Sequence, residues 1–106
     1  MYEKLVRDKI PEIIKQNNEQ PIIRILTDGE YKKELEKKLF EEYNEVLNSM
    51  GDSRIEELAD MLEVMISLAE VENKSFEEIE KIRVLKKEKR GGFSKKIYLE
   101  RVNKNK

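Results

Sequence analysis

Residues 30–71 read EYKKELEKKLFEEYNEVLNSMGDSRIEELADMLEVMISLAEV, and this stretch decides the fold. Its apolar residues recur at about 100° per residue, the period of an α-helix. Thr27 with Glu30 and Ser53 with Glu56 have the spacing of helix-capping boxes, and Gly51 is placed to end the first helix. We therefore expect helices over 30–50 and 54–71, which a turn at 51–53 makes antiparallel neighbours.

Weaker signals surround this pair. Pro11 suits the first turn of a short helix that ends near Gln16, and a third long helix is expected from Ser75 to about Lys89, before Gly91-Gly92 stops it. Residues 22–26 are β-prone and 96–102 alternate apolar with polar side chains, so the two segments are candidates for one short β pairing. The expected fold is an all-α, antiparallel helical bundle that forms a single domain over 1–106.

The composition excludes several kinds of chemistry. The chain has no cysteine and no histidine, so it offers no disulfide, no thiolate zinc site and no histidine general base. A bound metal must be held by oxygen, which favours Mg²⁺ and also allows Mn²⁺. No segment has the roughly 18 uninterrupted apolar residues of a membrane span, and the N-terminus lacks a signal-peptide pattern, so a cytoplasmic protein without membrane contact is expected.

Two acidic runs lie on the expected helix pair, Glu41-Glu42-Tyr43-Asn44-Glu45 and Glu57-Leu58-Ala59-Asp60. On a helical wheel of the first helix, the angle from the centre of the apolar stripe is about 60° for Glu42, about 120° for Glu45 and about 160° for Glu41. Glu42 therefore borders the core, where a carboxylate loses solvation unless it is paired or binds a metal. The apolar stripe itself consists of Leu35, Leu39, Tyr43, Val46 and Met50.

The second helix is apolar on two sides. One side carries Ile55, Leu58, Leu62, Met65 and Ala69. The other side carries Met61, Val64 and Leu68, together with the acids Glu57 and Asp60. A helix that is apolar on two sides is buried on two sides. This pattern predicts a homo-oligomer, either a dimer or a tetramer.

The turn brings the two acidic runs to one level. At about 1.5 Å rise per residue, Glu42 and Glu45 lie roughly 13 and 9 Å from the turn, and Glu57 and Asp60 roughly 6 and 10 Å. Four such charges repel one another unless a divalent cation neutralises them. Solvated acidic faces are common in a chain with 42% charged residues, so spacing alone leaves both interpretations open.

The pattern E-E-x-x-E followed by E-x-x-D resembles the signature of the MazG-like, all-α nucleoside triphosphate pyrophosphohydrolases. Residues 4–11, KLVRDKIP, and 89–93, KRGGF, are similar to segments of a compact MazG-related subfamily. The resemblance implies Mg²⁺-dependent cleavage of a nucleoside triphosphate between its α and β phosphates, which yields a monophosphate and pyrophosphate. It leaves the base and the sugar open.

The resemblance also implies roles for individual residues. The metal ligands would be Glu42, Glu45, Glu57 and Asp60. A carboxylate that is not bound to the metal could take the proton of the water, and Glu45 is our choice for this base, with Arg90 as the other catalytic residue. Basic side chains are expected to bind the phosphates of the substrate. Phe93 is expected to stack on its base. The substrate-binding set is Lys4, Arg7, Lys9, Lys86, Lys89, Arg90 and Phe93.

Two other functions compete with the enzyme. A non-enzymatic, homo-oligomeric interaction module would use the two-sided helix and be indifferent to Mg²⁺. Nucleic-acid binding through the basic residues of 81–106 is disfavoured, because the net charge is −1 and basic and aromatic residues are not interleaved.

Overall fold

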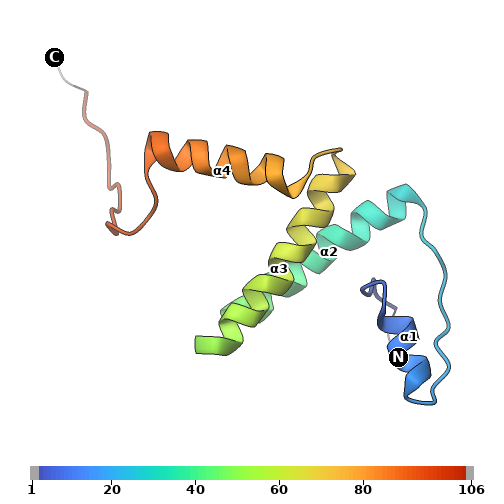
Figure 1. Ribbon diagram of the computed structural model, residues 1–106. Helices are drawn as coiled ribbons and strands as arrows, with labels where there is room; N and C mark the ends of the chain where they lie inside the picture. Colours follow the sequence, from blue (N-terminus) through green and yellow to red (C-terminus); the bar gives the residue numbers. More distant parts are fainter. Residues whose placement is uncertain (1–2, 105–106) are drawn as a thin grey trace. The chain divides into compact units, whose positions relative to one another are not determined.

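The structure is a computed structural model that describes residues 3–104. It contains the helices α1 (Ile10–Gln16), α2 (Asp28–Leu47), α3 (Gly51–Val71) and α4 (Phe76–Arg90) (Figure 1). The chain divides into two compact units, Met1–Ser75 and Phe76–Lys106, which are described separately. The expectation of an all-α protein is confirmed, and a single domain over 1–106 stays a prediction.

In the first unit α2 packs against α3 as a helical hairpin (Figure 1). Lys32, near the start of α2, lies 3.8 Å from Glu72, just after α3, as the antiparallel arrangement requires. The hydrophobic core of the hairpin is small. Among the described residues, only Leu35 on α2 and Val64 on α3 are buried apolar side chains, with 4% and 8% of their surface exposed.

The start of α2 follows the predicted capping box. The Glu30 backbone N–H donates to Thr27 Oγ1 at 3.2 Å, and the Thr27 backbone N–H donates to Glu30 Oε1 at 3.0 Å. Arg24 adds two hydrogen bonds to the same carboxylate, both at 3.1 Å. The two capping-box contacts satisfy backbone donors that the first turn of a helix leaves unpaired, and the Arg24 contacts hold the Glu30 carboxylate in place.

The predicted boundary between the two long helices was wrong by a few residues. Helix α2 ends at Leu47, and α3 already begins at Gly51, with Met50 at its N-cap and no side-chain cap. Gly51 has φ +60° and belongs to α3 instead of ending α2. The expected Ser53 capping box is therefore absent, because this residue lies inside the first turn of the helix.

The side chain that closes the hairpin is Arg54. Its Nε donates to the carbonyl oxygens of Val46 at 3.1 Å and Ser49 at 2.9 Å, so α3 satisfies acceptors at the end of α2. Asn48 also caps α2, donating from Nδ2 to the Asn44 carbonyl oxygen at 2.9 Å. The Arg54 contacts attach the start of α3 to the end of α2.

The buried stripe of α2 differs from the prediction. It runs through Leu35, which is buried, and through Leu39, Glu42 and Val46, which are half-buried, whereas Tyr43 is 46% exposed. The observed steps of four, three and four residues average about 3.7, close to the 3.6 residues of a helical turn, so the stripe stays on one side of α2, while repeated steps of four would drift around it. Met50 lies beyond the helix and is also exposed.

No strand occurs within residues 3–104, so the predicted β pairing of 22–26 with 96–102 was wrong. Ile22 and Ile25 are almost fully exposed, as are most apolar side chains of the second segment. Lys96 has φ +59°, which an extended strand does not allow. Alternation of apolar and polar residues produces a strand only where a neighbouring strand supplies backbone hydrogen bonds.

The second unit consists of α4 and the segment after it. Helix α4 begins one residue after Ser75 and ends at Arg90, where Gly91 adopts φ +87°, so the predicted glycine stop is confirmed. Within the described part of the chain, no helix combines the length and the apolar character that crossing a membrane requires.

Candidate metal centre

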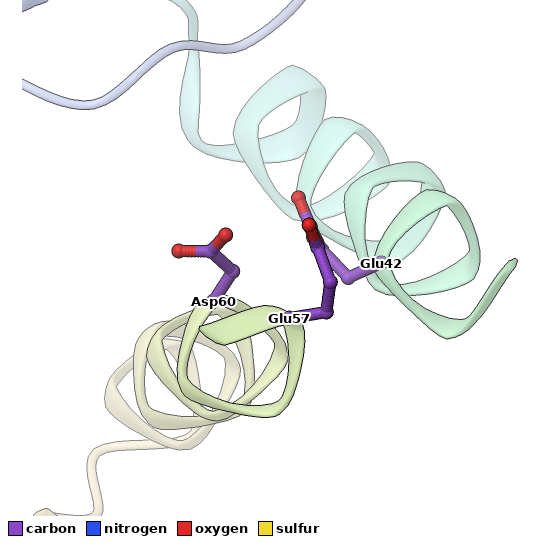
Figure 2. A group of neighbouring side chains, drawn as sticks. All are labelled: Glu42, Glu57 and Asp60. Atoms are coloured by element: carbon purple, nitrogen blue, oxygen red, sulfur yellow. The ribbon is translucent and has the colours of Figure 1, made fainter. Parts of the chain in front are cut away.

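Three carboxylates meet across the seam of the helical hairpin. Glu42 projects from α2, and Glu57 and Asp60 project from one side of α3 toward it (Figure 2). One oxygen from each of the three residues lies within 4.8 Å of the others. We call Glu42, Glu57 and Asp60 the carboxylate triad.

The helices bring the triad together by ordinary packing. Glu57 and Asp60 are three residues apart, so they share a side of α3, and buried Val64 lies one turn further along that side. On α2, Glu42 occupies the buried stripe between Leu39 and Val46. The prediction that Glu42 borders the core is therefore confirmed, and all three acids are half-buried.

Packing makes the triad electrostatically unfavourable. The pKa of Glu42 is raised, first because burial removes solvent from the carboxylate and then because of the charge of Asp60, with smaller contributions from Glu57 and Glu45. The pKa of Glu57 is raised by partial loss of solvent, followed by the charges of Glu45 and Asp60. These acids hold protons more tightly than isolated glutamates do.

Two cations from the same unit act on the triad. The guanidinium Nη2 of Arg7 donates to Asp60 Oδ1 at 2.7 Å, joining the segment before α1 to α3. On α2, the positive charge of Lys38 opposes the rise in the pKa of Glu42. The ammonium of Lys38 also lies 3.9 Å from Glu41 on the exposed side of the helix.

The donor set of the triad fits a hard divalent cation. Three carboxylate oxygens from two helices can converge on one ion, and the chain contains no imidazole or thiolate that would favour zinc or a softer metal. Loss of solvent and, after it, repulsion between the acids raise the pKa values of Glu42 and Glu57, and a divalent charge would offset both effects. Glu42, Glu57 and Asp60 are the residues that would hold Mg²⁺ or Mn²⁺.

The fourth predicted metal ligand lies beside the triad. Glu45 is exposed on α2, and its charge raises the pKa of both Glu42 and Glu57. Its carboxylate is outside the group of oxygens that lie within 4.8 Å of one another. The structure thus groups three of the four predicted ligands, with Glu45 as an adjacent acid, and Glu41 is exposed as expected.

The predicted substrate-binding residues fall in both units. In the first, Arg7 reaches the triad, while Lys4 and Lys9 are exposed on the same N-terminal segment. The remaining residues belong to the second unit: Lys86, Lys89 and Arg90 lie on α4, and Phe93 follows it with 97% of its surface exposed. Their roles stay predictions.

Sequence reasoning missed the parts played by Lys38 and Arg54. Lys38 lies four residues before Glu42, and this spacing on a helix signals an ion-pair neighbour. Arg54 gave no comparable signal, because its acceptors are backbone carbonyl oxygens at the end of another helix. The contact of Arg7 with Asp60 spans 53 positions and was not expected either.

Comparison with known proteins provides a partial match. The chain is 50% identical over 42 residues to an uncharacterized protein of Mycolicibacterium smegmatis (strain ATCC 700084 / mc(2)155), and the match covers 40% of this chain. The chain spans 43% of the length of that protein. No protein-family model and no solved structure matches.

Proposed function

We propose that this chain is a Mg²⁺-dependent nucleoside triphosphate pyrophosphohydrolase of the MazG-like superfamily, with Mn²⁺ as an alternative metal. The carboxylate triad carries the proposal, because its three members occupy metal-ligand positions of the E-E-x-x-E and E-x-x-D signature that the sequence resembles. The reaction is hydrolysis of the α–β anhydride bond, which releases a nucleoside monophosphate and pyrophosphate, as expected of an enzyme that cleans the nucleotide pool.

The chemistry needs charge neutralisation and a nucleophilic water. A bound divalent cation would neutralise phosphate oxygens, orient the substrate and make the water more acidic. Glu42, Glu57 and Asp60 would hold the cation at the seam, and Glu45 would take the proton of the water. Its exposed carboxylate lies outside the triad, so it remains available for this role.

Cationic side chains would bind the rest of the polyphosphate. Arg7 already lies at the triad, and Lys4 and Lys9 follow the same segment. The second unit carries its own proposed substrate-binding residues, Lys86, Lys89, Arg90 and Phe93. Arg90 is proposed to assist catalysis by stabilising negative charge, and Phe93 to stack on the base. Guanidinium groups suit this task because they bind phosphate oxygens in a bidentate manner.

The direct test is pyrophosphate release from a panel of standard and damaged nucleoside triphosphates with Mg²⁺. Asp60→Asn removes the charge of one triad carboxylate at constant size and should lower kcat/KM at least ~100-fold, in line with losses seen when one group that stabilises transition-state charge is removed. Glu63→Gln is the matched control, because this acid is exposed on the same helix and lies outside the triad. Full activity of Asp60→Asn, or no turnover of any triphosphate, refutes the proposal.

A homo-oligomeric interaction module is the second candidate, and one observation favours it. Although α3 packs against α2, the side of α3 that carries Ile55, Leu58, Leu62 and Met65 is exposed in the single chain. Such a contiguous apolar surface is typical of an interface. If the chain serves only this purpose, Glu57→Gln leaves assembly unchanged with or without Mg²⁺, and no triphosphate is turned over.

The same surface belongs to the proposed enzyme as well. We infer that a second copy covers it and that the enzyme works as a homo-oligomer, either a dimer or a tetramer. Oligomerisation and the metal centre use opposite sides of α3, so one does not exclude the other.

A further inference from the structure

The contact between Arg7 and Asp60 places a positive charge at the centre where a cation is proposed to bind. The guanidinium uses Nη2 to donate to a single oxygen, Oδ1, at 2.7 Å. Both side chains are open to solvent, with 57% of Arg7 and 47% of Asp60 exposed. Exposed ion pairs of this kind are weak and easily exchanged.

Arg7 and a divalent cation have the same electrostatic partner. The Asp60 carboxylate belongs to the triad, so an ion held there would stand within a few ångströms of the guanidinium. Two positive charges at such a distance repel each other, and this repulsion opposes simultaneous binding. The guanidinium is also attached to a segment that precedes a helix of only 7 residues, which lacks buried side chains and so is weakly anchored.

We propose that Arg7 is the internal counter-ion of Asp60, that a divalent cation displaces it, and that the freed guanidinium then binds the substrate polyphosphate. Arg7 is therefore a substrate-binding residue whose charge also sets the cation affinity of the site and the order of binding, with the cation before the polyphosphate. This inference depends on the metal centre of the proposed function and adds the exchange at Asp60.

The proposed exchange predicts whether the loss of Arg7 raises or lowers the affinity for a cation. If Arg7 competes with the cation, Arg7→Ala should increase the affinity for Mn²⁺ by about three- to ten-fold at low salt, and high ionic strength should reduce the gain. If Arg7 only held Asp60 in place, the same variant would bind Mn²⁺ more weakly. Mn²⁺ binding is followed by titration calorimetry and by the loss of the free-ion EPR signal.

Two variants keep this test specific. Arg7→Lys retains the charge and should stay near the wild-type affinity. Arg24→Ala removes the same charge from an exposed pair in the same unit, with Glu30 instead of Asp60, and should change the affinity little. In an Asp60→Asn background the gain from Arg7→Ala should disappear, because the side chain through which Arg7 acts has lost its charge.

The second readout follows the N-terminal segment itself. Because the chain contains no cysteine, Glu3→Cys provides a unique site for a fluorescent label at an exposed position. Coupling between two contacts is reciprocal. If Arg7 weakens the binding of the cation, the cation must also weaken the contact of Arg7 with Asp60. Addition of Mg²⁺ should therefore lower the label anisotropy in the wild type, and should have little effect in Arg7→Ala, where the segment is already released.

The outcomes separate this inference from the function on which it depends. Equal or weaker Mn²⁺ binding by Arg7→Ala, or an unchanged label anisotropy in the wild type, overturns the exchange and leaves the enzyme proposal standing. Failure of every protein to bind Mn²⁺ overturns the metal centre and the exchange together. Metal binding with the expected gain but no triphosphate turnover refutes the enzyme alone.

Discussion

One carboxylate oxygen of Glu42 on α2 lies within 4.8 Å of one carboxylate oxygen of Glu57 on α3. Both acids have raised pKa values, so their ionised forms are less stable in the folded chain than in the unfolded one. Like charges at the seam oppose closure of the very hairpin that carries them. A site that costs stability on its own is a common property of functional centres.

The first prediction concerns this cost. Without divalent cations at pH 7, Glu42→Gln should raise the Tm by a few degrees, on the order expected for a sub-kilocalorie gain in a chain of this size. The amide keeps the shape of the side chain and removes its charge. Thermal unfolding by circular dichroism in a chelating buffer measures the change, and a lower Tm contradicts it. Glu41→Gln, on the exposed side of α2, should leave the Tm unchanged.

The second prediction follows from the sign of the pKa shifts. A carboxyl group with a raised pKa binds its proton more tightly in the folded state, so protonation stabilises the fold. The Tm of the wild type should rise as the pH falls from 7 through the raised pKa values of Glu42 and Glu57 toward the ordinary value of 4.5. The rise should be much smaller in the double variant Glu42→Gln/Glu57→Gln.

Further acidification should reverse this trend. Hydrogen bonds from Arg24, and then from the Thr27 backbone, lower the pKa of Glu30 from 4.5 to about 2. The stability that ionised Glu30 contributes is present above 4.5 and is lost as the pH falls from there through about 2. The pH profile should therefore pass through a maximum, and Glu30→Gln should weaken its acidic limb. A Tm that rises steadily below pH 4 contradicts this assignment.

The third prediction tests the cation without using activity. Mg²⁺ or Mn²⁺ should raise the Tm of the wild type, because a ligand that binds only the folded state stabilises it by RT ln(1 + [L]/Kd), about 2.7 kcal/mol at one hundred times Kd. Glu57→Gln should lose most of the shift, while Glu63→Gln should keep it. An equal shift in all three proteins would mean that the cation binds elsewhere.

The fourth prediction concerns the helix start that positions Glu42. Thr27→Ala removes the side-chain acceptor of the Glu30 N–H and should cost about 1 kcal/mol of unfolding free energy in urea denaturation. Thr27→Ser retains the hydroxyl and should leave the stability nearly unchanged, because serine caps helices at least as well as threonine. Equal stability of both variants would show that Arg24 and Glu30 hold the first turn without Thr27.

The helices were predictable because their signals are local. Pro11, the Thr27 capping box and Gly91 each act within a few residues, and the structure begins or ends a helix at or beside each of them. The half-buried position of Glu42 was also predictable, because it follows from helical periodicity alone. The wheel failed at Tyr43, since the direction of the partner helix, not the composition of α2, decides which edge of the stripe is buried.

Contacts between distant segments could not be predicted. The hydrogen bond from Arg7 to Asp60 depends on where an N-terminal segment returns to α3, which no local pattern encodes. The β pairing was expected from alternation in 22–26 and 96–102, yet a strand also depends on a neighbouring edge and on backbone angles such as that of Lys96. The triad lay between these cases, because helical spacing and a short turn were enough to place it.

The fifth prediction asks which side of α3 is covered in solution. Leu35 is 4% exposed, so Leu35→Ala should cost about 2–4 kcal/mol at any protein concentration. Leu62 is 42% exposed in the single chain, and Leu62→Ala should be nearly neutral there. In the proposed homo-oligomer the same side chain is covered, so the cost of Leu62→Ala should approach that of a core substitution and grow with protein concentration.

Leu62→Lys should shift the mass measured by light scattering toward that of one chain. A single-chain mass for the wild type at all concentrations, with a neutral Leu62→Ala, refutes the oligomer and leaves the metal centre unaffected, because the triad lies on the other side of α3.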